Sequence, residues 1–230
     1  KLLLHLFPFN HFSFLHFIIA RKTPSHSQDT SVSIIVPAKN EAGNIDALFQ
    51  GLPVLHSKQE IIFVVAKSKD HTREEINHCI EKYASHLPFT FALLDQTGTG
   101  KAQAVWQGFK KAKHEVLMIY DSDLSVKPQE LAKFYWALIS GKGEFINGSR
   151  LIYPLETNAM QFINILGNKF FSLMYSFILG QNIKDTLCGT KVLWRRHFKI
   201  MQKKYPDFFI HDPFGDFALL TAASKLNLKI

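Results

Sequence analysis

Cysteine is scarce in this 230-residue sequence, which contains only Cys79 and Cys188. The two lack the paired spacing of a disulfide framework or a zinc site, so neither is expected and a reducing compartment is the default. No histidine stands beside Cys188 as a partner, which favours a packing role over that of a nucleophile.

The sequence also lacks a dense run of Lys or Arg, although its formal net charge is +8. Aromatic residues are not interleaved with basic ones in the manner of proteins that bind single-stranded nucleic acid, so no nucleic-acid partner is expected. The positive charge suits other anions, such as nucleotide diphosphates and phospholipid head groups.

The first 20 residues are strongly apolar, but they lack the small-residue cleavage site of a signal peptide. Pro8 and three histidines make them poor material for a spanning helix, which needs about 20 cleaner residues. Residues 1–30 are therefore interpreted as an apolar leader and linker, either the tail of a preceding domain or a membrane-surface segment. Residues 31–230 form the main domain. Its end at Lys229-Ile230 resembles the start of a strand, so we expect it to be truncated at the C-terminus.

From residue 31 onward, short apolar runs alternate with one-sided helical patterns. Strands are expected at 32–36, 60–65, 89–94 and 116–120, and helices at 41–52, 73–85 and 101–113. This alternation predicts an α/β fold with a mostly parallel central sheet and helices on both faces. Ligands of such sheets bind beyond the carboxyl ends of the strands, where the polar segments 37–41, 68–72 and 121–123 are expected.

Asp121 and Asp123 flank one small residue, Ser122, directly after the run 116–120. Two carboxylates so close repel each other unless a cation or a donor lies between them. Mg²⁺ or Mn²⁺ binds through one or two carboxylates plus substrate phosphates, so both aspartates are candidate metal ligands. The alternative is a solvated turn in which an Asp caps a helix starting near Pro128. The buried strand before the pair favours the metal site.

Taken in order, four motifs resemble those of family 2 glycosyltransferases with the GT-A (Rossmann-like) fold. They are Ile35-Val36-Pro37-Ala38-Lys39-Asn40-Glu41, Asp70, Asp121-Ser122-Asp123 and Gly148-Ser149-Arg150. Within that family the sequence is most similar to dolichyl- or polyprenyl-phosphate sugar transferases. The resemblance covers about residues 31–230.

The resemblance implies a nucleotide pocket lined by Pro37, Ala38, Asn40 and Glu41, with Ser122 beside it and Glu41 near the ribose or base. Asp70 would contact the base or its surroundings. From the residues alone, Asn40-Glu41 are equally candidates to cap the following helix, and Asp70 is a candidate turn residue.

One departure from the family pattern follows the second strand. Family members often carry two acidic residues there, and this sequence has Val65 and Ala66. The nucleotide is therefore not defined by the resemblance, and a weakened or inactive enzyme is an alternative.

Thr97-Gly98-Thr99-Gly100-Lys101-Ala102 is a glycine-rich entry to a helix. Free backbone N–H groups, the helix dipole and the Lys101 ammonium suit an anionic diphosphate, so Gly100 and Lys101 are candidate donor-binding residues. The spacing of a P-loop is absent. A flexible loop before a helix is the simpler alternative.

Three further residues are assigned mainly by the resemblance. Arg150 would clamp phosphate oxygens, and Lys191, in Cys188-Gly189-Thr190-Lys191, would meet an acceptor phosphate. Asp216 is the candidate general base if the acceptor is a hydroxyl, and an N-cap otherwise.

Residues 158–180 form a helical pattern with a narrow polar stripe and a wide apolar face. Two interpretations stand side by side. The helix lies in a membrane interface and delivers a lipid acceptor, or it is buried between the sheet and further C-terminal elements.

The sequence thus predicts inverting, metal-assisted transfer from a UDP- or GDP-sugar to an acceptor, foremost a polyprenyl or dolichyl phosphate, at the cytoplasmic face of a membrane. A phosphate acceptor is already anionic and needs no protein base. The alternatives are transfer to a saccharide hydroxyl with Asp216 as base, and a non-catalytic nucleotide- or lipid-binding module.

Overall fold

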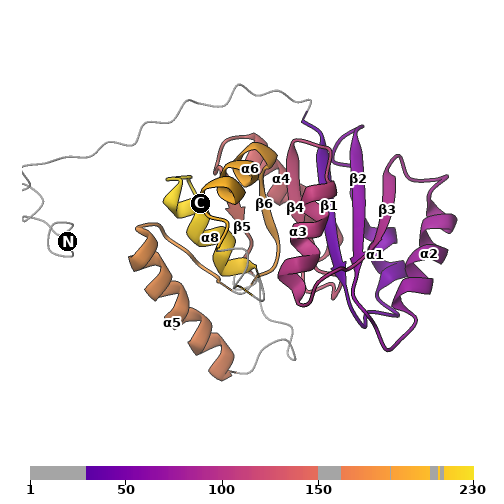
Figure 1. Ribbon diagram of the computed structural model, residues 1–230, viewed down its shortest axis with the longest axis horizontal. Helices are drawn as coiled ribbons and strands as arrows, with labels where there is room; N and C mark the ends of the chain where they lie inside the picture. Colours follow the sequence, from indigo (N-terminus) through magenta and orange to yellow (C-terminus); the bar gives the residue numbers. More distant parts are fainter. Residues whose placement is uncertain (1–29, 150–161, 187, 208–211, 213–214) are drawn as a thin grey trace, which may run out of the picture.

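Six strands form one sheet that organises the domain (Figure 1). The computed structural model describes residues 30–149, 162–186, 188–207, 212 and 215–230. Along the chain, the strands are β1 (Val32–Ala38), β2 (Gln59–Val65), β3 (Thr90–Asp95), β4 (Val116–Ile119), β5 (Phe145–Asn147) and β6 (Lys191–Trp194). Across the sheet they lie in the order β3-β2-β1-β4-β6-β5. Strands β1 to β4 pair in parallel, and β6 runs antiparallel to both β4 and β5. The expected α/β fold with a mostly parallel sheet is confirmed.

Helices cover both faces of the sheet. On one face lie α1 (Ile45–Gly51), α2 (Thr72–Tyr83) and α4 (Leu131–Ile139), which follows the short 3-10 helix η3 (Pro128–Glu130). On the other face lie α3 (Lys101–Lys111), α6 (Arg195–Lys204) and α8 (Asp216–Lys225). Every side chain of β2 and β4 is buried, as expected for strands covered on both faces.

Several boundaries differ from those expected. Helix α1 begins at Ile45 rather than at residue 41, because Asn40 and Gly43 have φ angles of 55° and 95° that no α-helix accommodates. Helix α3 ends at Lys111, where Ala112 turns extended. The antiparallel strand β6 was not anticipated, since a four-residue run that begins with a lysine carries little strand signal. Lys229 and Ile230 do not form a strand, although the Lys229 carbonyl accepts hydrogen bonds from Glu144 and Phe145 at the start of β5.

Helix α5 (Phe162–Leu179) stands at the margin of the domain (Figure 1). It carries the part of the pattern 158–180 that falls within the described residues, while residues 1–29 and 158–161 lie outside them. In the described part of the chain, no helix is both long and apolar enough to cross a membrane.

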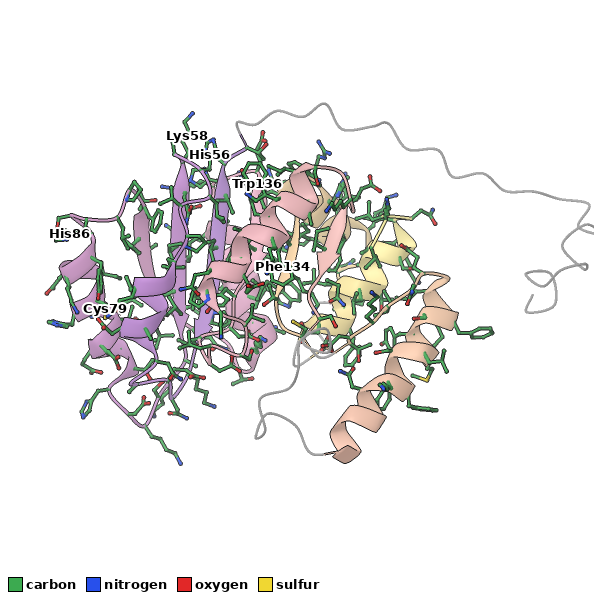
Figure 2. All side chains as sticks on the ribbon, turned by 180° about the vertical axis from the view of Figure 1, so that it is seen from behind. His56, Lys58, Cys79, His86, Phe134 and Trp136 are labelled. Carbon is green, nitrogen blue, oxygen red and sulfur yellow. The ribbon has the colours of Figure 1, made fainter. Side chains whose placement is uncertain are left out.

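The two thiols are buried, at 1% exposure each. Cys79 lies on the inner side of α2 (Figure 2), where burial, and next the charge of Asp46, raise the pKa of its thiol to about 11. A thiol that stays protonated is a poor nucleophile, so Cys79 packs in the core rather than reacting.

Close packing of α3 on β1 rests on Gly108. A Cβ atom at Gly108 would lie 2.5 Å from Cγ2 of Ile35, a branched side chain fixed in the core. We predict that Gly108→Ala lowers the free energy of unfolding by about 1–3 kcal/mol in urea titrations, since overpacking exceeds the helix propensity gained. Gly167→Ala in α5 is the matched control, because a Cβ there meets nothing within 4 Å. It should stabilise the protein by up to about 1 kcal/mol. Equal effects of the two substitutions would contradict the packing argument.

Candidate active site

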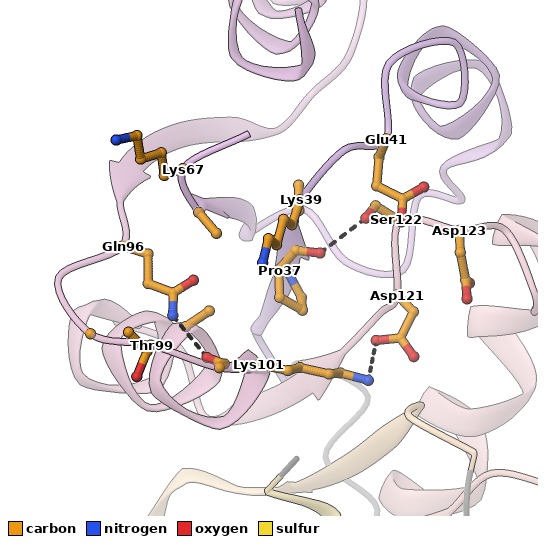
Figure 3. Close-up of a pocket in the computed structure, with 15 residues that line it drawn as sticks. Pro37, Lys39, Glu41, Lys67, Gln96, Thr99, Lys101, Asp121, Ser122 and Asp123 are labelled. Atoms are coloured by element: carbon orange, nitrogen blue, oxygen red, sulfur yellow. Dashed lines mark hydrogen bonds and ion pairs between the residues drawn. The ribbon is translucent and has the colours of Figure 1, made fainter. Parts of the chain in front are cut away.

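The carboxyl ends of β1, β2, β3 and β4 open into a cleft of about 430 Å³ (Figure 3). Eight residues predicted for the site from the sequence line it: Pro37, Ala38, Glu41, Gly100, Lys101, Asp121, Ser122 and Asp123. The cleft is further lined by Lys39, Ala66, Lys67, Gln96, Gly98, Thr99 and Ala104. Of the three polar segments expected beyond the strand ends, 37–41 and 121–123 contribute residues to the cleft, whereas 68–72 does not.

The turn 121–123 is held against the end of β1. The buried Ser122 hydroxyl donates to the Pro37 carbonyl at 3.0 Å, so Ser122 turns inward. Asp121 and Asp123 consequently point to the cleft side (Figure 3). Asp123 Oδ1 accepts the Ser125 N–H at 2.9 Å, and Leu124 has a φ of 56°. The interpretation of the pair as caps of the helix near Pro128 is wrong, because no side chain caps η3 or α4.

Asp121 forms an ion pair with Lys101, with 2.6 Å between Oδ1 and Nζ. The backbone of Gly189 closes over this pair. A Cβ atom at Gly189 would lie 2.0 Å from Asp121 Oδ2 and 2.4 Å from Lys101 Nζ. Gly189 is a site residue that the sequence analysis did not identify. Its signal was a glycine two residues before β6, which pairs with β4, and that strand was itself missed.

Two glutamines brace the glycine-rich loop. Gln96 Nε2 donates to the Gly100 carbonyl at 2.8 Å, and Gln107 Nε2 donates to the Asp95 carbonyl at 2.7 Å. Gln107 Oε1 accepts the Thr97 N–H at 3.0 Å. Gly100 has a φ of 83°, which a residue with a side chain rarely adopts. The loop is thus organised by specific hydrogen bonds around the N-terminus of α3, and neither glutamine had been singled out.

Asn40 and Asp70 do not line the cleft. Asn40 Oδ1 accepts the Lys69 N–H at 2.8 Å, and Asp70 Oδ2 accepts the Ala42 N–H at 3.1 Å. The Thr72 hydroxyl and backbone N–H groups hold the pKa of the Asp70 carboxyl below its ordinary value. Both side chains tie the loop after β1 to the loop after β2, so any contribution to nucleotide binding is indirect. The helix-capping alternative for Asn40-Glu41 is wrong, because the N-cap of α1 is Asn44.

Lys191 and Asp216 contact each other next to the cleft. Lys191 is fully buried, with Nζ 2.9 Å from Asp216 Oδ1 and donating to the Cys188 carbonyl at 2.6 Å. The predicted contact of Lys191 with an acceptor phosphate requires its ammonium to leave this pair. Asp216 does not act as an N-cap, since it is the first residue of α8 and Gly215 precedes it as cap. Arg150 lies outside the described residues.

The carboxylates of the cleft suit a metal ion that takes its remaining ligands from the substrate. Across the described ranges, no group of three or more His, Cys, Asp or Glu side chains gathers as a metal site. Asp121 and Asp123 instead offer two carboxylates beside an open cleft. Mg²⁺ and Mn²⁺ suit such a site, because phosphate oxygens of a ligand complete their coordination.

Burial raises the pKa of the Glu41 carboxyl above its ordinary value. Asp123 and Asp121 add to this rise, while the Asn44 amide, which donates to Glu41 Oε2 at 2.8 Å, opposes it. A raised folded-state pKa means that ionised Glu41 destabilises the fold increasingly as the pH rises through that pKa.

We therefore predict that Glu41→Gln raises the melting temperature at neutral pH, and that the gain disappears as the pH falls towards the ordinary value of 4.5. Thermal unfolding followed by circular dichroism measures this difference. Glu81→Gln, on the exposed side of α2, is the control. A gain that stays constant with pH would contradict the assignment.

A second prediction concerns Gly189. Gly189→Ala should weaken Mn²⁺ binding by about 10-fold or more, because the new Cβ displaces the Asp121 carboxylate. Titration calorimetry with MnCl₂ and a nucleoside diphosphate measures this. Gly167→Ala is the control, because a Cβ there meets nothing within 4 Å and Gly167, unlike Gly180 with its φ of 66°, has no positive φ. If Gly189→Ala binds Mn²⁺ as tightly as Gly167→Ala does, the steric argument is refuted.

Comparison with known proteins agrees with this geometry. The model of the family described as glycosyl transferase family 2 matches residues 33–201. The chain is 27% identical over 175 residues to the probable glycosyltransferase YdaM of Bacillus subtilis, covering 71% of this chain and 41% of that protein. It is 31% identical over 167 residues to a dolichol-phosphate mannosyltransferase of Pyrococcus furiosus, covering 69% of this chain and 44% of that protein. The chain thus spans less than half the length of these two relatives.

A solved structure shows the same fold. Glucosyl-3-phosphoglycerate synthase from Mycobacterium tuberculosis, in complex with Mn²⁺, UDP-glucose and phosphoglyceric acid, matches with a TM-score of 0.56 and 15% identity. The match covers 73% of this chain and 58% of that one. The fold and the family match agree, and the chain belongs to glycosyl transferase family 2.

Proposed function

We propose that this chain transfers a glycosyl group, with inversion, from a UDP- or GDP-sugar to a polyprenyl or dolichyl phosphate. One observation carries the proposal: the cleft has paired carboxylates on one side and a helix N-terminus with a lysine on the other. A nucleotide diphosphate with a bound divalent cation has the matching charges, because the cation needs the carboxylates and the phosphates need the N–H groups and ammonium.

Each side of the cleft has a distinct task in this reaction. Asp121 and Asp123 hold Mg²⁺ or Mn²⁺, which neutralises the charge that develops on the departing diphosphate. Lys101 and the N-terminus of α3 contact the phosphate oxygens. Pro37, Ala38 and Glu41 line the end of β1 and receive the nucleoside. Where the family often has two acidic residues, this chain has Val65 at the end of β2 and Ala66 after it, so neither position offers a carboxylate to the base.

A phosphate acceptor suits the observed state of Asp216. Its carboxylate is paired with Lys191 and only 12% exposed, a poor arrangement for removing a proton from a sugar hydroxyl. A lipid phosphate is already anionic and needs no base. The Pyrococcus furiosus relative is named for a dolichol-phosphate acceptor, which supports the same choice.

Helix α5 supports a lipid acceptor through its inverted polarity. Asn168 and Ser172 are buried, at 1% and 6% exposure, whereas the apolar side chains on its outer side are exposed. The exposed ones are Phe170, Phe171, Leu173, Met174, Phe177 and Ile178, with up to 73% of their surface accessible, and side chains there project away from the domain (Figure 2).

Such a face is typical of a helix that lies in a membrane interface. We propose an anionic lipid surface as its occupant, because Lys169 and Lys184 are exposed on α5 and on the segment that follows it, and the chain carries a net charge of +8. On this proposal the domain works at the cytoplasmic face of a membrane. The alternative is that further C-terminal elements bury the apolar face of α5, and the vesicle-binding experiment distinguishes the two.

A non-catalytic nucleotide-binding module is the second candidate, favoured by Val65 and Ala66 where the family often has acidic residues. Binding and turnover separate the two. We predict that a UDP- or GDP-sugar with Mn²⁺ raises the melting temperature, and that a radiolabelled sugar is transferred to polyprenyl phosphate. Binding without transfer or hydrolysis favours the module, and no binding of any nucleotide sugar contradicts both.

The metal assignment predicts that Asp123→Ala lowers transfer on the order of 100-fold and abolishes the Mn²⁺-dependent part of the thermal shift. Asp95→Ala is the matched control, because Asp95 also ends a strand but pairs with Arg73 and does not line the cleft. Intact transfer by Asp123→Ala would show that the metal site is elsewhere.

The membrane assignment predicts that Leu173→Glu/Phe177→Glu lowers binding to anionic phospholipid vesicles at least about 10-fold, since two apolar side chains no longer enter the interface. Val54→Glu/Ile200→Glu, two exposed apolar residues away from α5, should leave vesicle binding unchanged. Co-sedimentation measures both. Equal binding of the two double variants would refute docking through α5 and favour burial by protein.

A further inference from the structure

The Lys101–Asp121 ion pair uses a carboxylate that the proposed metal also needs. Nζ lies 2.6 Å from Oδ1, and the two side chains are 28% and 20% exposed. Gly189 closes one side of the pair so tightly that no Cβ fits there. An ammonium and a divalent cation therefore compete for the same partly buried oxygen.

Charged groups of both signs line the cleft around this pair. They are the carboxylates of Glu41, Asp121 and Asp123 and the ammonium groups of Lys39, Lys67 and Lys101, and the two aspartates contribute to the raised pKa of Glu41. Lys101 is the cation in ion-pair contact with Asp121, so it offsets part of their mutual repulsion.

Lys101 also has a second group of partners within reach. It is the first residue of α3, directly after Gly100, and it lines the cleft where the helix N-terminus opens. The four-carbon side chain of a lysine can turn between two anions without movement of the backbone. A bound diphosphate and the Asp121 carboxylate are two such anions.

We propose that Lys101 is an internal counter-ion that is exchanged during donor binding. It neutralises Asp121 until a divalent cation takes the carboxylate, and its ammonium then moves to the diphosphate of the donor. The inference rests on the proposed function of this cleft. It assigns Lys101 a role in how metal and nucleotide bind together, beyond contact with phosphate.

The exchange makes metal and nucleotide binding cooperative. Metal alone must displace Lys101 and leave its ammonium without a partner, whereas with a diphosphate present the displaced ammonium gains one. Each ligand should therefore raise the affinity for the other by the same factor, as linkage requires. Such coupling typically changes an affinity by about 5- to 150-fold.

The test compares Mn²⁺ affinities with and without saturating UDP or GDP, by calorimetry or by electron paramagnetic resonance of free Mn²⁺. In the unmodified chain, the nucleotide should raise Mn²⁺ affinity at least about 5-fold. Lys101→Met should bind Mn²⁺ alone more tightly than the unmodified chain, and its coupling factor should fall to the smaller value that direct contact between Mn²⁺ and phosphate supplies. Lys101→Arg, which keeps the charge, should retain most of the coupling. Lys110→Met, exposed near the end of the same helix, is the matched control.

The outcomes separate this inference from the proposed function. If Lys101→Met remains folded and binds Mn²⁺ alone no more tightly than the unmodified chain, or keeps the full coupling, the counter-ion role is wrong while the donor site stands. If the unmodified chain binds neither UDP nor GDP with Mn²⁺, the proposed function itself is wrong. Circular dichroism of each variant establishes that it is folded.

Discussion

The hydrogen-bonded register between β1 and β4 is the constraint on which the site depends. Val32 pairs with Val116 and Ile35 with Ile119, and the pairing continues beyond the strand through the Tyr120 N–H and the Ile35 carbonyl at 2.9 Å. Ser122 then bonds to the Pro37 carbonyl. A slip of one residue between β4 and β1 would shift the turn 121–123 along the end of β1 and separate Ser122 from the Pro37 carbonyl. The register of two buried strands thus decides where the turn that carries both aspartates stands.

Much of this arrangement follows from local sequence. The runs that became β1, β2 and β4 are almost wholly apolar, and Asp121 and Asp123 stand directly after one of them, so the topology alone predicts where they lie. The features that were missed depend on contacts between distant segments. Gly189 matters because β6 inserts antiparallel beside β4, and four residues beginning with Lys191 give no strand pattern. The pairing of Lys191 with Asp216 joins residues 25 positions apart, which no local pattern encodes.

Helix α5 shows why an amphipathic pattern does not by itself reveal orientation. Its narrow polar stripe suggests a solvated face, but the structure turns that stripe towards residues 183–186. The Asn168 amide donates to Asp185 Oδ1 at 2.9 Å, and the Ser172 hydroxyl donates to the Lys184 carbonyl at 3.1 Å. Buried polar groups of a connecting segment need such partners. The apolar residues of α5 therefore face outward as a consequence of the hydrogen-bonding needs of its neighbour.

The same segment joins the apolar face to the metal-binding carboxylates. Asp185 Oδ1 accepts the Asn168 amide and also the Cys188 N–H at 3.1 Å, while the Cys188 carbonyl accepts the buried Lys191 ammonium. The next residue, Gly189, packs on Asp121 and Lys101. Among the described residues, the contacts of Asp185 and Cys188 thus connect α5 to Gly189 at the cleft. A displacement of α5 that broke the Asn168–Asp185 bond would leave a buried carboxylate short of a donor, which is costly. The position of the exposed apolar face is thus linked energetically to the position of the backbone that closes over Asp121.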